Sequence, residues 1–422
     1  GRADPALSTS LSQALSIYPY LYLSNSLSIY LSISLSLIQE EEKVLPVIDL
    51  SLAKGHTRAG LVKELHEALT TVGFIYLKNV DGYDEEALLR HSKWFFSLPM
   101  EQRMAISKKS FNPKCSNEYR GYFPVIPGAV SHKEAFEIGP KQGKPKEGLI
   151  SLEEKFIIED NQWPLESRGI RGGQEIQAFF TYLLLINTIF IYIYLSSLPF
   201  LHLSFCQTWM EVYHEKMTEA SRELLSLIAE GYGAPSDFYA DIFRDPHLST
   251  LRLIRYPARP NPTYEARDGD AVIQTAEHQD TTMVTLPATF AEYPGLQVRW
   301  WKDDSIIDVT HKPGHLVMNI GQLLSYTSGG ALKATKHRVI DCCGDRLSVP
   351  FILEPRFHAN VNVVLPGCEQ RESQPKYYGH WLLEGIRKWA EYKDLCRRIE
   401  TQTAKTLYEG EEDEDEVMMW KK

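Results

Sequence analysis

The chain has 422 residues, of which 43% are apolar, so it can bury at least one large core. Its 45 basic residues are outnumbered by 55 acidic ones, and the acids concentrate in the run from Glu409 to Glu416. This balance argues against a nucleic-acid-binding groove. The six cysteines form no CxxC pair, and we expect them to be reduced thiols in a cytoplasmic protein.

Residues 1–43 are built almost wholly from Ser, Leu, Ile and Tyr, without a 2-residue or 3.6-residue period. Such a low-complexity stretch predicts disorder, or sequence that is foreign to the native protein. A secretory signal is disfavoured because Arg2 is the only base and serines interrupt the apolar run.

Residues 44–168 are expected to form an N-terminal α/β portion. VLPVIDLS from Val44 and GFIYLKNV from Gly73 have the pattern of strands. Between them, TRAGLVKELHEALTTVG predicts a helix. Its apolar stripe consists of Leu61, Leu65, Leu69 and Val72.

An atypical apolar insertion covers residues 169–207. Its stretch from Phe179 to Leu195 is about as long as a minimal membrane span. A bias towards β-branched and aromatic residues and the missing basic flank argue against such a span. A third explanation is that this stretch and residues 1–43 are both translated non-coding sequence, and we favour it.

Residues 208–400 are expected to form the main domain, followed by an acidic tail at 401–422. A long amphipathic helix should begin at about Thr208 and end near Gly231. From Leu251 to Leu365, short apolar or alternating runs are separated by Gly, Pro and Asp. This succession predicts a barrel or a jelly roll.

A candidate metal site follows from His278 and Asp280, which are two residues apart in AEHQDTTMVTL. On a strand, this spacing places both side chains on one face. His337, in KATKHRVI, begins a later apolar strand and is a candidate third ligand. Two histidines and one carboxylate fit the facial triad of non-haem iron(II).

A second H-x-[DE] pair, His132 and Glu134, competes with this assignment because the pattern arises easily by chance. It lies in an earlier, loop-like stretch without a strand-borne histidine after it. We therefore interpret His132 as a solvated surface residue.

A candidate anion receptor follows in RLSVPF, where Arg346 and Ser348 share one face of a strand. A guanidinium fork next to a hydroxyl group suits a carboxylate. The alternative is a surface arginine in a salt bridge. The position of Arg346, nine residues after His337, favours the receptor.

These signatures, HQD, HRV and RLS in this order, resemble those of the iron(II)/2-oxoglutarate-dependent dioxygenases of the isopenicillin N synthase-like family. The resemblance covers roughly residues 44–165 and 208–400. It implies a mainly β fold, in which a double-stranded β-helix (jelly-roll) core has flanking helices and an N-terminal α/β portion. Further matches are LPVIDLS, GFIYLKNV, RGYFPV, KEAFEIG, LRLIRYP, GLQV and NIG.

The resemblance implies that Arg346 and Ser348 hold the distal carboxylate of 2-oxoglutarate and that Tyr256 of LRLIRYP also donates to this cosubstrate. Ile254 and Arg255 depart from the asparagine- and tyrosine-containing version of this segment in plant members, which weakens the assignment of Tyr256. We assign no catalytic role to Gln322. His311, His315 and His358 are expected to be structural.

The implied activity uses iron(II), 2-oxoglutarate and O2 to hydroxylate, desaturate or cyclise a small organic molecule, with release of succinate and CO2. We expect a monomer that binds neither nucleic acid nor membrane. One alternative is an oxidase that, like isopenicillin N synthase, uses no 2-oxoglutarate. Others are a catalytically inactive jelly-roll binding protein and a mis-assembled gene product that does not fold. Substrate choice should depend on the N-terminal portion, the loop 120–128 and the C-terminal helix near His380 to Arg398.

Overall fold

The computed structural model describes residues 43–141, 152–164, 199–259, 267–269, 271–342, 344–369 and 374–409. Residues 1–42, residues 169–198 of the predicted insertion and the acidic run after residue 409 lie outside the described residues. The described residues from 45 onward belong to one compact unit.

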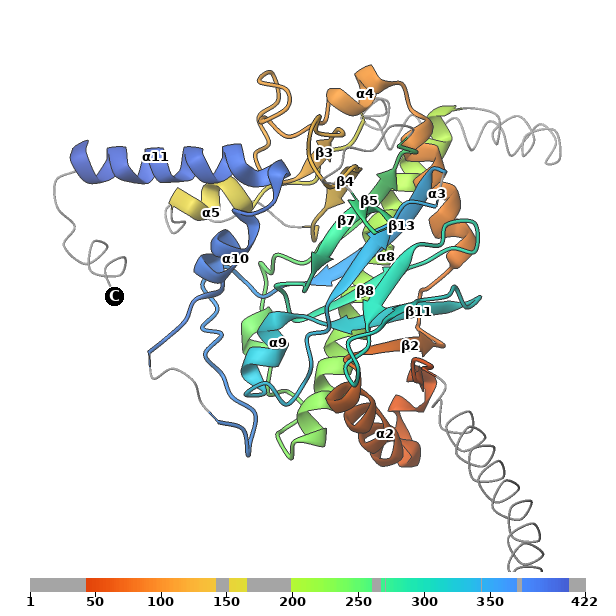
Figure 1. Ribbon diagram of the computed structural model, residues 1–422. Helices are drawn as coiled ribbons and strands as arrows, with labels where there is room; N and C mark the ends of the chain where they lie inside the picture. The colour runs from red at the N-terminus through yellow and green to blue at the C-terminus, as the bar shows by residue number, and fades with distance from the viewer. Residues whose placement is uncertain are drawn as a thin grey trace, which may run out of the picture. The chain divides into compact units, whose positions relative to one another are not determined.

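Two β-sheets form the centre of this unit (Figure 1). The larger sheet has the strand order β1-β2-β11-β8-β13-β5-β4-β3, and the smaller one has the order β10-β9-β12-β7-β6. Apolar side chains of both sheets share one core cluster, so the sheets pack face to face. This is the predicted jelly roll, with the predicted N-terminal strands β1 and β2 added to the larger sheet. The strands of the larger sheet are β1 Val47–Asp49, β2 Phe74–Lys78, β3 Gly121–Phe123, β4 Glu134–Ile138, β5 Thr250–Tyr256, β8 Val284–Ala288, β11 His315–Ile320 and β13 Arg346–Leu353; those of the smaller one are β6 Arg267–Asp268, β7 Ala271–His278, β9 Leu296–Arg299, β10 Ile306–Asp308 and β12 His337–Ile340.

Helices flank the sheets, and α8 crosses one face of the larger sheet, where it contacts β13 and β8 (Figure 1). The predicted stripe of α2 is confirmed, because Leu61, Leu65 and Leu69 are all buried. No helix among the described residues is both long and apolar enough for a membrane span. The α-helices are α2 Arg58–Thr71, α3 Glu85–Ser97, α4 Met100–Met104, α5 Leu152–Ile157, α8 Pro199–Gly231, α9 Gln322–Thr327, α10 Tyr378–Ile386 and α11 Lys393–Glu409; short 3-10 turns lie at η1 Leu50–Ala53, η2 Gly55–Thr57, η4 Ala240–Phe243 and η6 Ala390–Tyr392.

The start of α8 differs from the prediction. This helix begins at Pro199, nine residues before Thr208, and so includes the end of the predicted insertion. Cys206, within that end, is buried in the main core cluster. Sequence composition set the boundary too late, because the apolar residues before Thr208 hid the helical period. The five described cysteines, among them Cys206, form no disulfide with one another.

Strand β13 gives the larger sheet two different faces. Leu347, Val349, Phe351 and Leu353 point to one face and are buried in the core cluster that includes the apolar side of α8. Arg346 and Ser348 point to the opposite face, towards the smaller sheet, because side chains alternate along a strand. One strand therefore holds the core with one face and presents polar groups with the other.

Replacement of Phe351 by alanine should lower the free energy of unfolding by about 3–5 kcal/mol, because its ring is fully buried and packs edge-on against His214. Chemical denaturation measures this loss. The control is Val212→Ala on the exposed side of α8, where the side chain is 48% exposed and the change should stay within about 0.5 kcal/mol. Equal effects of the two changes would contradict the assignment of this core.

Candidate active site

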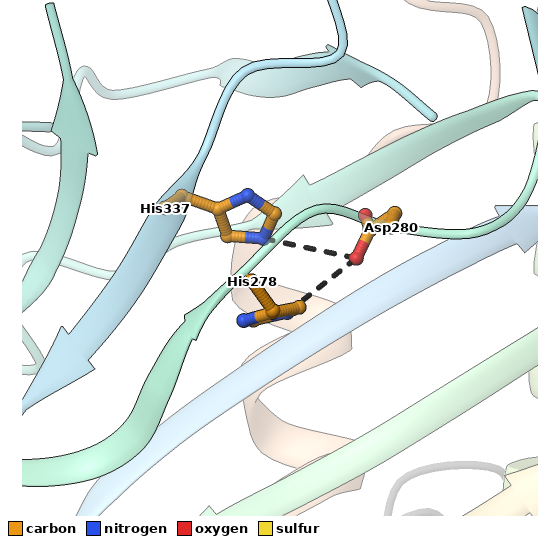
Figure 2. Close-up of side chains that lie close together, drawn as sticks. All are labelled: His278, Asp280 and His337. Carbon is orange, nitrogen blue, oxygen red and sulfur yellow. Dashed lines mark ion pairs between the residues drawn. The ribbon is translucent and has the colours of Figure 1, made fainter. Parts of the chain in front are cut away.

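The three candidate metal ligands converge at one end of the smaller sheet. His278 is the last residue of β7, His337 is the first residue of β12, and Asp280 lies just beyond β7. Asp280 Oδ1 is 3.5 Å from Nε2 of His278 and 3.7 Å from Nε2 of His337, the pairs drawn in Figure 2. One ligand atom from each residue fits within a 4.8 Å span, the only such group of three or more His, Cys, Asp or Glu residues that the described part of the chain contains.

Strand pairing brings the two imidazoles together. β7 and β12 run antiparallel with His278 and His337 as direct partners, and their ring centres are 4.3 Å apart. Asp280, however, does not extend the strand as its spacing predicted. β7 ends at His278, and the backbone carbonyl of Asp280 accepts a hydrogen bond from the amide of Gln322 at the start of α9 (2.7 Å). The carboxylate thus reaches the site from a turn, which sequence periodicity does not distinguish from a strand.

Backbone carbonyl groups orient both imidazoles. Nδ1 of His278 lies 2.8 Å from the carbonyl oxygen of Ala276, and Nδ1 of His337 lies 3.3 Å from that of Thr335. In the tautomer that donates from Nδ1, each Nε2 has a free lone pair that faces Asp280. A metal-binding histidine is commonly fixed in this way by a hydrogen bond from its other nitrogen.

The two oxygens of Asp280 have separate partners. Oδ2 accepts hydrogen bonds from Thr285 Oγ1 (2.6 Å) and Asn319 Nδ2 (2.8 Å). Oδ1 is therefore the oxygen that faces the two imidazoles. Asn319 belongs to the sequence match NIG, but the sequence did not show that it contacts Asp280, because the contact joins residues 39 positions apart.

The protonation states of His337 and Asp280 suit the binding of a metal cation. Burial, together with the neighbouring His278, lowers the pKa of His337 to about 4, although Asp280 opposes this shift. His337 is thus neutral near pH 7 and can coordinate. Burial works against ionisation of Asp280, but His337, His278 and Asn319 together hold the pKa of this carboxyl well below its usual range. The neutral imidazole of His337 and the carboxylate of Asp280 thus face the same position. Both groups belong to the donor set of a non-haem iron(II) site.

Arg346 and Ser348 lie in the same pocket as the three candidate ligands. Arg346 Nε donates to the carbonyl oxygen of Pro294 (2.9 Å), and the guanidinium group lies 5.0 Å from the ring centre of Tyr256, its partner across β13 and β5. Arg346 Nη1 is enclosed and has no hydrogen-bond partner in the described structure. Nor do the described residues supply a carboxylate in an ion pair with Arg346. Arg346 is only 5% exposed, so the surface position considered from the sequence is wrong.

Two predictions about other residues need correction. His132 is half-buried rather than solvated, and its amide donates to the carbonyl oxygen of Gln274 (3.2 Å). Glu134 is a buried residue of β4 that pairs with Arg103 (2.5 Å) and Arg255 (3.0 Å), so its carboxylate already has two cations. The rival metal pair is thus excluded by the partners of Glu134 rather than by exposure.

The loop 120–128 was expected to shape the pocket, but none of its residues lines it. Tyr119, which directly precedes the loop, is a lining residue. Its residues Gly121–Phe123 form β3, which pairs with β4 at the edge of the larger sheet. In the C-terminal segment, α10, η6 and the residue just before η6 contribute to the lining, and their effect on substrate choice stays a prediction. Their lining residues are Leu382, Ile386, Trp389 and Tyr392.

Comparison with known proteins agrees with this arrangement. Two family models match: "non-haem dioxygenase in morphine synthesis N-terminal" over residues 45–166, and "2OG-Fe(II) oxygenase superfamily" over residues 248–355. The second includes both β7 and β12, and it ends just after β13. The fold and the matching family models together define a 2-oxoglutarate- and iron(II)-dependent oxygenase.

The chain is 26% identical to a 2-oxoglutarate-dependent dioxygenase of Dothideomycetidae sp. (strain 11243), with 73% of each chain covered. It is 24% identical to isopenicillin N synthase of Flavobacterium sp. (strain SC 12,154), with 81% of this chain and 97% of that protein covered. Among solved structures, a full-length Neurospora crassa protein in complex with alpha-KG and 5-formyluracil matches with a TM-score of 0.60 at 23% identity, over 82% of this chain and 96% of that one. At this identity, the structural match supports the fold alone.

The chain belongs to the isopenicillin N synthase-like family of iron(II)/2-oxoglutarate-dependent dioxygenases. It is an enzyme of this class that acts on a small molecule and uses iron(II), 2-oxoglutarate and O2.

Replacement of His278 or Asp280 by alanine should abolish iron(II) binding, because each change removes one of three candidate ligands. Anaerobic equilibrium dialysis measures the bound metal. His132→Ala is the matched control and should bind iron like the unchanged protein, since its neighbour Glu134 is held by two arginines. Loss of iron in His132→Ala with retention in His278→Ala would reverse the assignment.

Thr285→Val should weaken iron binding by about 10- to 100-fold, because the change keeps the side-chain volume but removes a hydrogen bond to Asp280 Oδ2. The same dialysis experiment measures the effect. Thr289→Val is the control, since the buried hydroxyl of Thr289 has no hydrogen-bond partner in the described structure. If the two valine variants bound iron equally well, the positioning role of Thr285 would be wrong.

Proposed function

We propose that His278, Asp280 and His337 hold the iron(II) ion and that Arg346 and Ser348 hold the distal carboxylate of 2-oxoglutarate. Tyr256, whose ring lies against the guanidinium group of Arg346, is included as a third contact of this carboxylate. The proposal is supported by the convergence of the three ligand atoms and by the polar side chains that share their pocket.

The observation that carries the cosubstrate assignment is the incompletely paired guanidinium group of Arg346. Burial lowers the pKa of Arg346, since a charge is costly away from water unless it is paired. One carboxylate, placed between Arg346 and Ser348, would supply the missing acceptor for Nη1. The short, negatively charged distal end of 2-oxoglutarate has this chemistry.

The residues of the chain then have distinct tasks. The bound iron(II) and 2-oxoglutarate supply the oxidising chemistry that hydroxylates, desaturates or cyclises the substrate, with release of succinate and CO2. Arg346 and Ser348 position the cosubstrate, and the imidazoles and Asp280 fix the metal. Trp389 packs edge-on against His278 at 5.3 Å and helps to exclude water from that side of the site. The monomeric state and the cytoplasmic compartment stay predictions of the sequence.

One product, succinate, distinguishes the proposed function from the alternative of an oxidase that uses no 2-oxoglutarate. Turnover with added iron(II) should release succinate in proportion to the 2-oxoglutarate consumed. An oxidised substrate without succinate would support the alternative. Iron that binds without consumption of 2-oxoglutarate or of any substrate would support the inactive binding protein.

Arg346→Gln should raise the KM for 2-oxoglutarate by about 30-fold or more, which corresponds to a loss of roughly 2 kcal/mol from a buried charge-assisted contact. Succinate release at varied 2-oxoglutarate concentration measures this change, and iron binding should stay intact. Arg338→Gln is the control, since Arg338 pairs with the exposed Asp268 and does not line the pocket, so the change should leave the KM within about twofold. An unchanged KM in Arg346→Gln would remove Arg346 from the cosubstrate site.

A further inference from the structure

The pocket extends from the metal site into a second part that the iron and 2-oxoglutarate assignments leave unused. Two cationic side chains, Arg252 and Lys133, line this part. Arg252 is on β5, and Lys133 directly precedes β4, the neighbouring strand of the larger sheet. Neither residue is assigned a role in the chemistry described above.

The position of Arg252 separates it from the cosubstrate site. Arg252 and Tyr256 point to the same face of β5 because they are four residues apart, and Tyr256 is the direct partner of Arg346. Four residues of strand span roughly 13 Å at about 3.3 Å per residue. Arg252 and Arg346 therefore serve different parts of the pocket, and one small diacid bound to Arg346 and the metal would leave Arg252 free.

The guanidinium group of Arg252 is only partly paired. Its Nη2 atom lies 2.5 Å from Glu137 Oε1 and donates to the hydroxyl of Tyr392 (3.0 Å). Its Nε atom is enclosed without a hydrogen-bond partner in the described structure. A donor of this kind is costly when left unsatisfied, so a bound acceptor would stabilise it.

Lys133 links this part of the pocket to the metal site. Its side chain is 6% exposed, and its Nζ atom is 3.2 Å from Glu391 Oε1 and 4.8 Å from the ring centre of Trp389. The same Trp389 ring contacts His278. The single side chain of Trp389 thus connects Lys133 with the candidate metal ligand His278.

The local charge balance is positive. Glu137 is shared by two cations, Arg252 and the fully buried Lys108, whose Nζ is 2.6 Å away. Burial lowers the pKa of Lys108 to about 8, with Glu137 opposing, so Lys108 remains mostly protonated at neutral pH. With Lys133 and its partner Glu391, three cations face two carboxylates. One more negative charge would balance this cluster.

A third carboxyl in the pocket, that of Glu354, is held by other partners. Glu354 lines the pocket, but burial raises its pKa, and its two oxygens accept hydrogen bonds from Tyr378 (2.7 Å) and Thr250 (2.8 Å). No ion pair joins Glu354 to Arg252 or Lys133 in the part of the chain that the structure describes. A bound anion would give Arg252 and Lys133 a direct partner that Glu354 does not provide.

Apolar side chains also line this part of the pocket. Its walls come from α10, from η6 and its flank, and from the larger sheet, with Leu382, Ile386, Trp389 and Ile254 among the lining residues. A ligand that fits both the cations and these walls has an anionic end and an apolar body.

We propose that Arg252, assisted by Lys133, binds a carboxylate group of the oxidised substrate, so that the substrate class of this enzyme is a small organic acid with an apolar body. This inference rests on the proposed function, because it takes the metal and Arg346 as the sites of iron and 2-oxoglutarate. It makes Arg252 a substrate-binding residue rather than only a counter-ion of Glu137.

Ligand binding tests the proposal directly. The full chain, loaded with manganese(II) as a redox-inert substitute and with 2-oxoglutarate, is titrated with matched probes: hexanoate, hexanamide and hexylamine, and 3-phenylpropanoate with its amide and amine. Calorimetry measures each affinity. Within a set, the acid should bind about tenfold or more tightly than the amide, and the amine should bind least, because only the acid satisfies the cationic cluster.

Arg252→Gln should remove this preference for acids, Lys133→Gln should reduce it, and Arg252→Lys should retain part of it. All three should bind manganese and 2-oxoglutarate as the unchanged protein does. Arg255→Gln is the matched control: Arg255 is on the same strand but points to the other face, where it pairs with Asp345 and Glu134. It should keep the full preference for acids. Thermal unfolding identifies any variant that does not fold, in which case Lys133→Gln and Arg252→Lys carry the test.

The proposal is overturned if amides or amines bind as well as the acids, if no acid binds, or if the preference for acids survives in Arg252→Gln and Lys133→Gln. These results count against the substrate assignment alone when manganese and 2-oxoglutarate still bind. Failure of the unchanged protein to bind manganese or 2-oxoglutarate would instead refute the proposed function.

Discussion

The antiparallel pairing of β7 with β12 is the constraint on which the site depends. It makes His278 and His337 direct partners, and β12 is itself held from its other side by β9, where His337 is opposite Val298. Because side chains alternate along a strand, a slip of one residue in this pairing would turn an imidazole away from the pocket. The hydrophobic partners of β12 in the core between the sheets therefore also fix the positions of the candidate metal ligands. The register between β7 and β12 therefore affects both the stability of the smaller sheet and the positions of the candidate metal ligands.

The larger sheet contributes a different constraint through β13. Its core-facing residues, such as Phe351, are fully buried, which anchors the strand against α8. The opposite face of the same strand carries Arg346 away from bulk water without a carboxylate among the described residues. A charge in this position costs stability until an anion binds, and the buried core face offsets that cost. The core face of β13 thus anchors the strand, and its opposite face carries the incompletely paired guanidinium group of Arg346.

The sequence predicted the parts of the site that follow from strand periodicity. His278, His337, Arg346 and Ser348 all lie on strands, where a spacing of two residues has a definite meaning, and the structure brings these residues into one pocket. Asp280 lies next to His278, as predicted, but it does not lie on a strand, since β7 ends two residues earlier. A turn that returns a side chain to the same point leaves no periodic signal.

Other features were inaccessible from the sequence because they depend on contacts between distant residues. Thr285 and Asn319 meet Asp280 only because β8 and β11 are neighbours in the sheet. The pairing of β3 with β4 removed the loop 120–128 from the pocket, although its glycines and prolines are typical of a binding loop. The early start of α8 was hidden because the apolar stretch before Thr208 shows no clear helical period in the sequence.

The two parts of the pocket also differ in where their residues come from along the chain. The candidate ligands of metal and cosubstrate all lie between Tyr256 and Ser348, within the jelly-roll core. The cationic part is assembled from three regions: Lys133 from the N-terminal portion, Arg252 from the core, and the residues around Glu391 from the C-terminal segment. Substitutions in the outer regions can change the charge and shape presented to a substrate without altering the β7–β12 register. Under the proposed assignments, the residues that hold iron and 2-oxoglutarate therefore come from other parts of the chain than most of those that would select the substrate.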